Sequence, residues 1–363
     1  MKRKPARDSK PQPKTKPGLL PKTKTAAQPK RISLALQGGG AHGAFTWGVI
    51  DYLLDDERIE IEAISGTSAG AMNAVVLAEG LLEGGRAAAK AQLERFWSNA
   101  SLDARLPSAQ RAALQWLINP FWRNANPAAG LMVDWMNQAS PYVFNPLGLN
   151  PMRDFLMKEI DFEKVRRSDG LKLFIAATNV ETGKIRIFNG AELTVDHILA
   201  SACLPGLFQT VMVDGAPYWD GGYMGNPAIY PLIYEAVAPD ILLVQINPIE
   251  RKGVPKTARE IQNRVGEISF NSSLLREMRA IDFVARLIDD GKLSSKEYKR
   301  VYIHRLAALE ALPDLTPDSK MDASWSFFLR LRDAGRSAAR EWLRKHFDDI
   351  GQRGTLDLRK EYM

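Results

Sequence analysis

Short runs of apolar residues alternate in this chain with stretches in which apolar positions recur every three or four residues. The first run, Ile32–Gln37, is followed by helical spacing from Phe45 to Leu54, and a second run, Ile61–Ile64, by helical spacing from Ala69 to Leu82. A glycine-containing segment separates strand from helix in both cases. After residue 31 the chain therefore begins with two strand–loop–helix units.

The pattern changes between about residues 84 and 151, where aromatic residues are interspersed with prolines. We predict short helices and loops here that form a cap over the sheet. Two interpretations stay open: the aromatic side chains fill the core of the cap, or they line an apolar channel or a membrane-contacting lid. The aromatic residues concerned are Phe96, Trp97, Trp116, Phe121, Trp122, Trp135, Tyr142 and Phe144.

Strands and helices alternate again beyond the cap. Apolar content predicts strands at 171–178, 184–188, 209–213, 218–219, 241–246 and 300–304, and helices at 194–203, from 226, at 259–293 and at 325–347. Basic residues stand between the apolar positions of the last two helices. This arrangement favours packing on the sheet with a solvated basic face, and the alternative is a membrane-surface or dimer contact.

The net charge of +7 is concentrated at the N-terminus. Residues 1–31 hold eleven Lys or Arg and one acidic residue, a net of +10, which leaves −3 for the rest of the chain. Six prolines and few large apolar side chains predict a disordered basic tail over 1–31. It is either a solubilising tail or an electrostatic anchor to an anionic membrane surface.

Composition otherwise describes an ordinary globular protein, with 45% apolar and 25% charged residues. The single cysteine, Cys203, excludes an internal disulfide and a cysteine metal cluster, which fits a reducing compartment. We find neither an apolar run of about 18 residues nor the apolar middle of a secretion signal. We therefore expect a protein that is either cytoplasmic or loosely attached to the inner membrane surface.

The second strand–loop–helix unit contains Gly66-Thr67-Ser68-Ala69-Gly70. This is the Gly-x-Ser-x-Gly pattern, in which a sharp strand-to-helix turn exposes a serine at its tip. The following helix directs free N–H groups and its positive dipole end toward a developing negative charge. Ser68 is therefore a candidate nucleophile.

The first unit contains Gly38-Gly39-Gly40-Ala41-His42-Gly43 between its strand and its helix. Such a loop exposes backbone N–H groups that hold negative charge. Gly38 to Gly43 also satisfies the dinucleotide pattern Gly-x-Gly-x-x-Gly, and Glu60 and Glu62 follow at about the spacing of a ribose-binding acid. A Rossmann-type cofactor protein is thus an alternative. Against it, Ile64-Ser65-Gly66 occupies the end of the second strand, where that acid should stand.

A third motif, Asp220-Gly221-Gly222, completes an ordered set with the glycine loop and the Ser68 turn. The three motifs, together with Ala200–Pro205 and Asn226-Pro227, resemble the patatin-like phospholipases, which are lipid acyl hydrolases. The resemblance covers roughly residues 32 to 250.

The resemblance implies a three-layer α/β/α fold with a mainly parallel central sheet and a helical cap. It implies a Ser–Asp dyad without histidine, in which Ser68 is the nucleophile and Asp220 the base. The amides of Gly38, Gly39 and Gly40 would form the oxyanion hole, and no metal or cofactor is required. On this basis residues 32–310 would form the catalytic domain, including the cap at about 84–151, and 311–363 a C-terminal helical extension.

His42 departs from the family pattern, which usually has Arg or Lys at this position. It either keeps the same structural hydrogen bonds or, as a sharper hypothesis, tunes activity through its protonation near pH 6.5.

Other residues offer competing assignments. Asp214 could be the base, although a turn residue is the simpler interpretation. His304 or His346 could complete a Ser–Asp–His triad. Cys203 is most simply a small buried apolar side chain.

The expected substrate is a lipid ester, and we see no motif that reads nucleic acid. Besides the cofactor protein, an inactive lipid-binding scaffold is a further alternative, disfavoured because Ser68 and Asp220 are both in place. The head group, acyl length and oligomeric state do not follow from the sequence.

Overall fold

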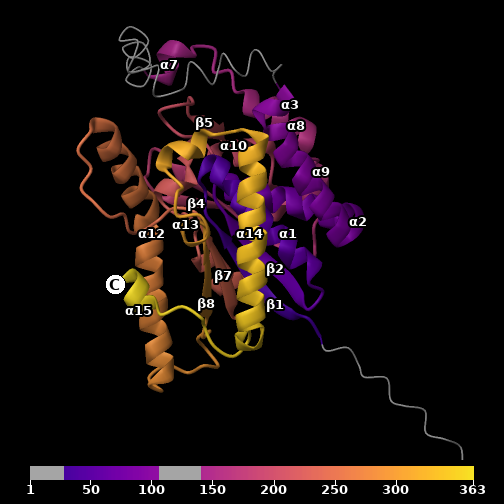
Figure 1. Cartoon of the computed structure of the whole chain (residues 1–363), viewed down its shortest axis with the longest axis vertical. Helices are drawn as coiled ribbons and strands as arrows, with labels where there is room; N and C mark the ends of the chain where they lie inside the picture. Colours follow the sequence, from indigo (N-terminus) through magenta and orange to yellow (C-terminus); the bar gives the residue numbers. More distant parts are fainter. Residues whose placement is uncertain (1–27, 106–139) are drawn as a thin grey trace, which may run out of the picture.

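The computed structural model describes residues 28–105 and 140–363, which form one mixed sheet covered by helices (Figure 1). The strand order is β5-β6-β3-β2-β1-β7-β8, and β4 also pairs with β3. The strands are β1 (Lys30–Leu36), β2 (Ile59–Gly66), β3 (Lys172–Asn179), β4 (Ile185–Asn189), β5 (Val211–Val213), β6 (Ala216–Asp220), β7 (Asp240–Gln245) and β8 (Tyr302–Ala307).

The centre of the sheet is parallel: β3, β2, β1, β7 and β8 run in the same direction, whereas β4 and β6 pair with β3 in the antiparallel sense. Carboxyl ends of adjacent parallel strands meet at one edge, which is where ligands bind in open α/β sheets. The loops after β1 and β2 are therefore neighbours. These are the glycine loop and the turn that carries Ser68.

Helices cover both faces of the sheet. They are α1 (Gly43–Asp55), α2 (Ala69–Ala100), α3 (Leu102–Arg105), α7 (Pro141–Phe144), α8 (Pro151–Glu159), α9 (Phe162–Arg166), α10 (Val195–Ser201), α11 (Tyr230–Glu235), α12 (Ala258–Asp289), α13 (Ala308–Ala311), α14 (Trp325–His346) and α15 (Leu358–Tyr362). Short 3₁₀ helices are η1 (Gly40–His42), η2 (Gly190–Glu192), η3 (Gly221–Tyr223), η4 (Pro317–Met321) and η5 (Phe347–Asp349).

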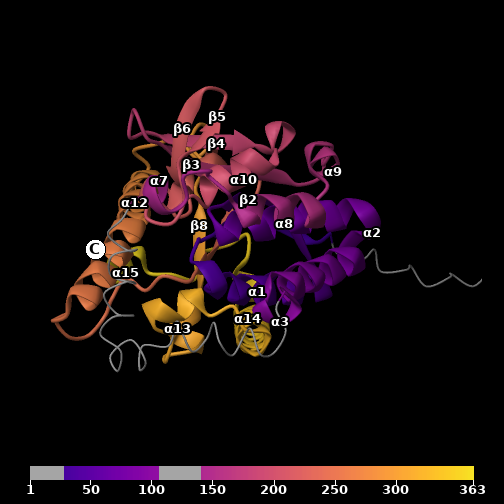
Figure 2. The same cartoon turned by 90° about the horizontal axis from the view of Figure 1, so that it is seen from above.

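Each face of the sheet has its own hydrophobic core. Along β1, Leu34 and Leu36 pack with α1, α2 and α14, while Ala35 between them packs with α11 and α12 on the opposite face. This alternation follows from the two-residue period of a strand. Seen from above, α12 and α15 lie on one side of the sheet and α1, α2 and α14 on the other (Figure 2). The predicted three-layer α/β/α fold with a mainly parallel sheet is confirmed.

The C-terminal part of the chain is built into these layers. β8 extends the sheet beside β7, and α14 runs along α1. The two helices approach closely at glycines: a Cβ on Gly48 would contact the Arg332 carbonyl, and one on Gly335 the Phe45 carbonyl. The apolar face of α14 is buried and Arg330, Arg340 and Arg344 are exposed, as expected for an amphipathic helix on a sheet. Arg332 and Arg336 are half-buried against α1, where Arg332 lies over Trp47 and Arg336 pairs with Asp55.

Among the boundaries that differ from the prediction, two change the residues assigned to the tail and to the cap. Lys30 and Arg31, assigned to the tail, belong to β1, where they pair with Ile59 and Glu60. Residues 1–27, the rest of the predicted tail, lie outside the described residues.

The helix that follows Ser68 continues beyond the predicted end at Leu82, as far as Ala100. It has a kink at Gly84 and Gly85, where the backbone is not helical. Phe96 and Trp97, which we assigned to the cap, are therefore buried in the core beside α1 and α14. The other predicted cap aromatics Trp116, Phe121, Trp122 and Trp135 lie outside the described residues.

Candidate active site

The turn that carries Ser68 is a strained connection between β2 and α2. Ser68 has a φ of 54° and a ψ of −119°, a conformation that side-chain-bearing residues rarely adopt. The two flanking glycines allow close packing. A Cβ on Gly66 would lie 2.8 Å from the backbone of Gly70, and one on Gly70 would collide with the Leu36 carbonyl of β1. The sequence Gly-x-Ser-x-Gly is thus required by the geometry of the turn.

Two hydrogen bonds hold this turn in place. The backbone N–H of Ser68 donates to Ser201 Oγ at 2.9 Å, and the Thr67 hydroxyl donates to the Gly225 carbonyl at 2.6 Å. Ser201 lies two residues before Cys203, whose carbonyl accepts the N–H of Asp220, and Gly225 follows Asp220 by five residues. The serine turn is thus tied to the region that carries the candidate base.

Sheet register brings Asp220 to the height of Ser68. On β3, Ile175 pairs with Gly66 of β2, and Ala177, two residues farther, pairs with Asp220 of β6. β2 ends at Gly66 and Ser68 follows in the turn, so the register brings Ser68 and Asp220 to the same end of β3. The Ser68 hydroxyl lies close enough to the Asp220 carboxylate to lower the pKa of Asp220.

Asp220 is fixed from several sides. Its N–H donates to the Cys203 carbonyl at 2.8 Å, and its own carbonyl accepts from the Thr178 hydroxyl at 2.9 Å. Carboxylate Oδ1 accepts the N–H of Gly222 at 2.7 Å. The residue is only 1% exposed, and this burial raises the pKa of Asp220 to about 7, against the opposite effects of the Gly222 N–H and the Ser68 hydroxyl. The carboxyl group can therefore exchange a proton near neutral pH.

The glycine loop lies directly beside Ser68. A Cβ on Gly38 would be 2.7 Å from Ser68 Cβ. The N–H of Gly38 donates to Asn226 Oδ1 at 2.7 Å, so this donor is already used, contrary to the expectation that all three glycine amides are free. Within the described residues no hydrogen bond is formed by the N–H of Gly39 or Gly40. The N–H groups of Gly39 and Gly40 are thus the ones of the three that stay available for a ligand.

His42 is buried behind the glycine loop. Its Nε2 lies 2.7 Å from Ser319 Oγ, and its Nδ1 has no hydrogen-bond partner among the described residues. Burial lowers the pKa of His42 to about 3, and the positive charges of Lys320 and Arg251 act in the same direction. The imidazole is therefore neutral between pH 5 and 8. This environment does not support the hypothesis that its protonation tunes activity near pH 6.5.

The acids of the dinucleotide alternative lie at the wrong end of β2. Glu60 pairs with Arg31, and Glu62 accepts the N–H groups of Val237 and Ala238. Glu60 precedes the strand end at Gly66 by six residues, which corresponds to about 20 Å along a strand. Neither acid reaches a ligand held by the glycine loop.

The competing acid and histidines are also engaged elsewhere. Asp214 occupies the turn between β5 and β6 with a φ of 51°, which agrees with its interpretation as a turn residue. His304 is fully buried between Asp240 and Thr355, and His346 pairs with Asp349 at the end of α14. Cys203 is buried, as expected.

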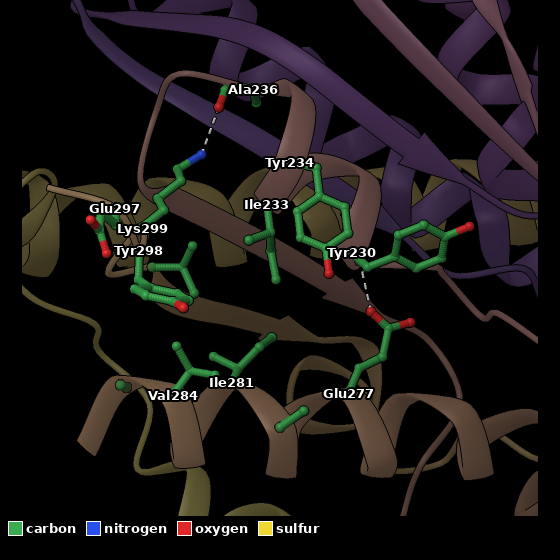
Figure 3. Close-up of a pocket in the computed structure, with 13 residues that line it drawn as sticks. Tyr230, Ile233, Tyr234, Ala236, Glu277, Ile281, Val284, Glu297, Tyr298 and Lys299 are labelled. Atoms are coloured by element: carbon green, nitrogen blue, oxygen red, sulfur yellow. Dashed lines mark hydrogen bonds between the residues drawn. The ribbon is translucent and has the colours of Figure 1, made fainter. Parts of the chain in front are cut away.

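A cavity of about 620 Å³ lies between α11 and α12 (Figure 3). Its walls are mainly apolar and aromatic, with Tyr230, Tyr234 and Ile281 among them, and neither Ser68 nor Asp220 lines it. Glu277 accepts the N–H groups of Ile229 and Tyr230 at 2.8 Å each, and burial raises the pKa of Glu277 to about 7. Glu277 therefore anchors the start of α11.

Four supporting residues escaped the sequence analysis. Ser201 and Asn226 lie in Ala200–Pro205 and Asn226-Pro227, segments that carry the family resemblance, so the sequence pointed to them although not to their hydrogen bonds with Ser68 and Gly38. No motif in the sequence pointed to Asn247 or Lys320. They approach the glycine loop only in the fold, and Asn247 Nδ2 donates to the Gly38 carbonyl at 2.7 Å. In the part of the chain that the structure describes, no three His, Cys, Asp or Glu side chains gather to hold a metal.

The fold and site together define a three-layer α/β/α protein with a serine at a strand-to-helix turn and a buried aspartate beside it. A family model described as patatin-like phospholipase matches residues 34–233, more than half of the chain. The protein therefore belongs to the patatin-like phospholipase family. Membership supports lipid acyl hydrolase activity in general, and no curated protein matches the sequence.

Solved structures offer more distant similarities. The chain is similar to VipD from Legionella pneumophila, with 15% identity and a TM-score of 0.41, over 88% of this chain and 67% of that one. It is also similar to ExoU in its complex with SpcU from the type III secretion system of Pseudomonas aeruginosa. Here the identity is 17% and the TM-score 0.38, over 88% of this chain and 52% of the other. The chain thus spans about half the length of the latter.

Proposed function

We propose that the protein is a serine hydrolase that cleaves fatty-acyl esters of phospholipids or acylglycerols through a Ser68–Asp220 dyad. One observation carries this proposal: the Ser68 hydroxyl lies beside a buried carboxylate of raised pKa and next to a loop in which two N–H groups have no partner among the described residues. A nucleophile, a base and an oxyanion site are the parts that acyl transfer needs.

The reaction begins when Ser68 Oγ attacks the ester carbonyl and its proton passes to Asp220. Charge develops on the carbonyl oxygen, where the N–H groups of Gly39 and Gly40 and the N-terminus of α2 stabilise it. Collapse of the tetrahedral intermediate breaks the bond to the alcohol or lysophospholipid, which takes the proton from Asp220 as it leaves. The products of this half-reaction are the acyl-enzyme and the free alcohol.

Water completes the cycle. Asp220, again a carboxylate, accepts a proton from water as the hydroxide attacks the acyl-Ser68 carbonyl, and the same N–H groups hold the second oxyanion. The proton then returns to Ser68 Oγ as the fatty acid is released. A carboxylate of ordinary pKa would be a weak base for both steps, so the burial of Asp220 is part of the mechanism.

The proposal extends to the membrane surface on which such substrates lie. Among the described residues no helix is long and apolar enough to cross a membrane. The basic residues of the tail would attract the protein to anionic lipid, because each adds about 1 kcal/mol near such a surface.

Fatty-acid release from mixed phospholipid and acylglycerol micelles tests the proposal. Ser68→Ala and Asp220→Asn should each lower the rate by about 10³-fold or more. Asp214→Asn is a matched control, since this acid also precedes a glycine but lies in a turn with positive φ that asparagine tolerates. Its rate should equal that of wild type. Full activity in Ser68→Ala, or no release from any ester by wild type, would contradict the proposal.

A further inference from the structure

The C-terminal segment places a lysine against the glycine loop. The 3₁₀ helix η4 packs so closely on η1 that a Cβ on Gly40 would lie 2.6 Å from the Lys320 carbonyl. In the same contact, Ser319 Oγ lies 2.7 Å from His42 Nε2. Segments distant in sequence thus form one unit around the loop that holds the unused N–H groups.

The ammonium group of Lys320 is connected to that loop through one amide. Lys320 Nζ donates to Asn247 Oδ1 at 2.6 Å, and Asn247 Nδ2 donates to the Gly38 carbonyl at 2.7 Å. The side chain of Gln37 fixes the same residue, because its Oε1 accepts both the backbone N–H and the Nδ2 of Asn247. The Asn247 amide therefore has its oxygen toward the cation and its nitrogen toward the loop.

The Gly38 carbonyl and the Gly39 N–H belong to the same peptide unit. This unit is planar and trans, so the two groups point in opposite directions and holding one sets the direction of the other. Hydrogen bonds in a chain also polarise each other. The Lys320 ammonium polarises the Asn247 amide, and this amide in turn polarises the Gly38–Gly39 peptide. Both effects make the Gly39 N–H a stronger hydrogen-bond donor.

We propose that Lys320 is a positioning residue of the oxyanion hole, which acts through Asn247 to orient and polarise the Gly38–Gly39 peptide. This inference rests on the hydrolase function proposed above. It assigns the C-terminal segment a part in the reaction: the segment supplies the charge that strengthens the Gly39 donor when negative charge develops on the substrate oxygen.

Within residues 28–105 and 140–363, Lys320 forms no ion pair with a carboxylate. Glu267, which faces Lys320 from α12, is already paired with Arg251 and Arg264 at 2.8 and 3.3 Å. His42 on η1 is neutral because burial lowers its pKa to about 3. Burial lowers the pKa of Lys320 as well, opposed by Glu267 and assisted by Arg251. The Lys320 ammonium is thus half-buried and donates to the neutral Asn247 amide. Its positive charge is therefore little compensated and acts electrostatically on the glycine loop.

Kinetics of Lys320→Met with p-nitrophenyl butyrate test the proposal. Its kcat should fall by about 10- to 100-fold with KM changed by less than about twofold, since the weakened donor matters only once the oxyanion forms. Lys252→Met is the matched control: it removes the same charge from an exposed position in the segment after β7, and its kcat should equal that of wild type. Phosphonylation of Ser68 by a fluorophosphonate should slow in parallel with kcat.

Chemical rescue separates the charge from a purely structural role. In Lys320→Ala, n-propylammonium chloride should restore kcat by about fivefold or more relative to sodium chloride of equal ionic strength, because the amine replaces the missing donor. If Lys320→Met unfolds below the assay temperature, Lys320→Gln carries the same test, as it keeps a donor to Asn247 without the charge. A kcat of Lys320→Met or Lys320→Gln within twofold of wild type, or no rescue, overturns the inference. Wild type that is never phosphonylated overturns the proposed function as well.

Discussion

The pH dependence of acylation follows from the burial of Asp220. Desolvation raises the pKa of Asp220 from 3.8 to about 7. Only the carboxylate accepts the Ser68 proton, so the rate should follow the ionised fraction. With a pKa of about 7 that fraction is about 1% at pH 5 and about 90% at pH 8, which predicts a rise of about 90-fold. With an ordinary carboxyl pKa the rate would change by less than about 10% over the same range.

The assay is the pseudo-first-order phosphonylation of Ser68 by an uncharged fluorophosphonate, measured from pH 5 to 8 at constant ionic strength. The value of kcat/KM for p-nitrophenyl butyrate, which reports the free enzyme, should follow the same curve. Circular dichroism at each pH verifies that the protein is folded. Ionisation of the buried Asp220 opposes folding, so stability should decrease, not increase, as pH rises toward 7.

Glu277 supplies the necessary control, because burial raises the pKa of this carboxyl to about 7 as well. Glu277→Gln should leave the midpoint of the rate profile unchanged. A flat profile between pH 5 and 8 would refute the assignment of Asp220 as a base of raised pKa. If the pH-dependent step disappears in Glu277→Gln, the titrating group is Glu277 and not Asp220, and the assignment of Asp220 as the base is contradicted.

Further predictions concern the turn, the histidine, the cavity and the tail. Gly70→Ala should lower Tm by about 4 °C or more and abolish hydrolysis, because the new methyl group meets the Leu36 carbonyl; thermal melts and ester assays check this. The rate ratio of wild type to His42→Arg should be constant between pH 5 and 8, and a ratio that titrates would show that His42 is charged there. Unfolding of wild type should become easier as pH rises from 4.5 to 7, by up to about 3 kcal/mol for each of Asp220 and Glu277, and Glu277→Gln should remove its share of this slope in denaturant titrations. Deletion of residues 1–27 should abolish salt-sensitive sedimentation with phosphatidylserine vesicles, and equal sedimentation with and without the tail would exclude electrostatic docking.

Ser68 and Asp220 could be predicted because each belongs to a short motif of consecutive residues. Gly66 and Gly70 are required by steric contacts within one strand–turn–helix unit, so the pattern around Ser68 is local. The Asp220 motif is local in the same sense. Their juxtaposition depends on the register of β3 with both β2 and β6, which the resemblance to a family supplied and the strand pattern alone did not.

The remaining features depend on contacts between distant segments. The N–H of Gly38 donates to Asn226, which is 188 residues away in sequence, and the low pKa of His42 arises from its burial beside η4. Lys320 carries no sequence signal, since a lysine in a polar stretch is most often solvated. The helix after Ser68 was predicted to end at Leu82, whereas α2 continues past the kink at Gly84 and Gly85 to Ala100, where Phe96 and Trp97 pack in the core.

Mapping of a covalent adduct on the native protein tests the central claim most directly. The full chain is treated with a fluorophosphonate, its intact mass is measured, and the modified peptide is sequenced by mass spectrometry. The account predicts one adduct per chain, located on Ser68, and none in Ser68→Ala or in protein unfolded before treatment. An adduct on another residue, or equal labelling of Ser68→Ala, would contradict the account.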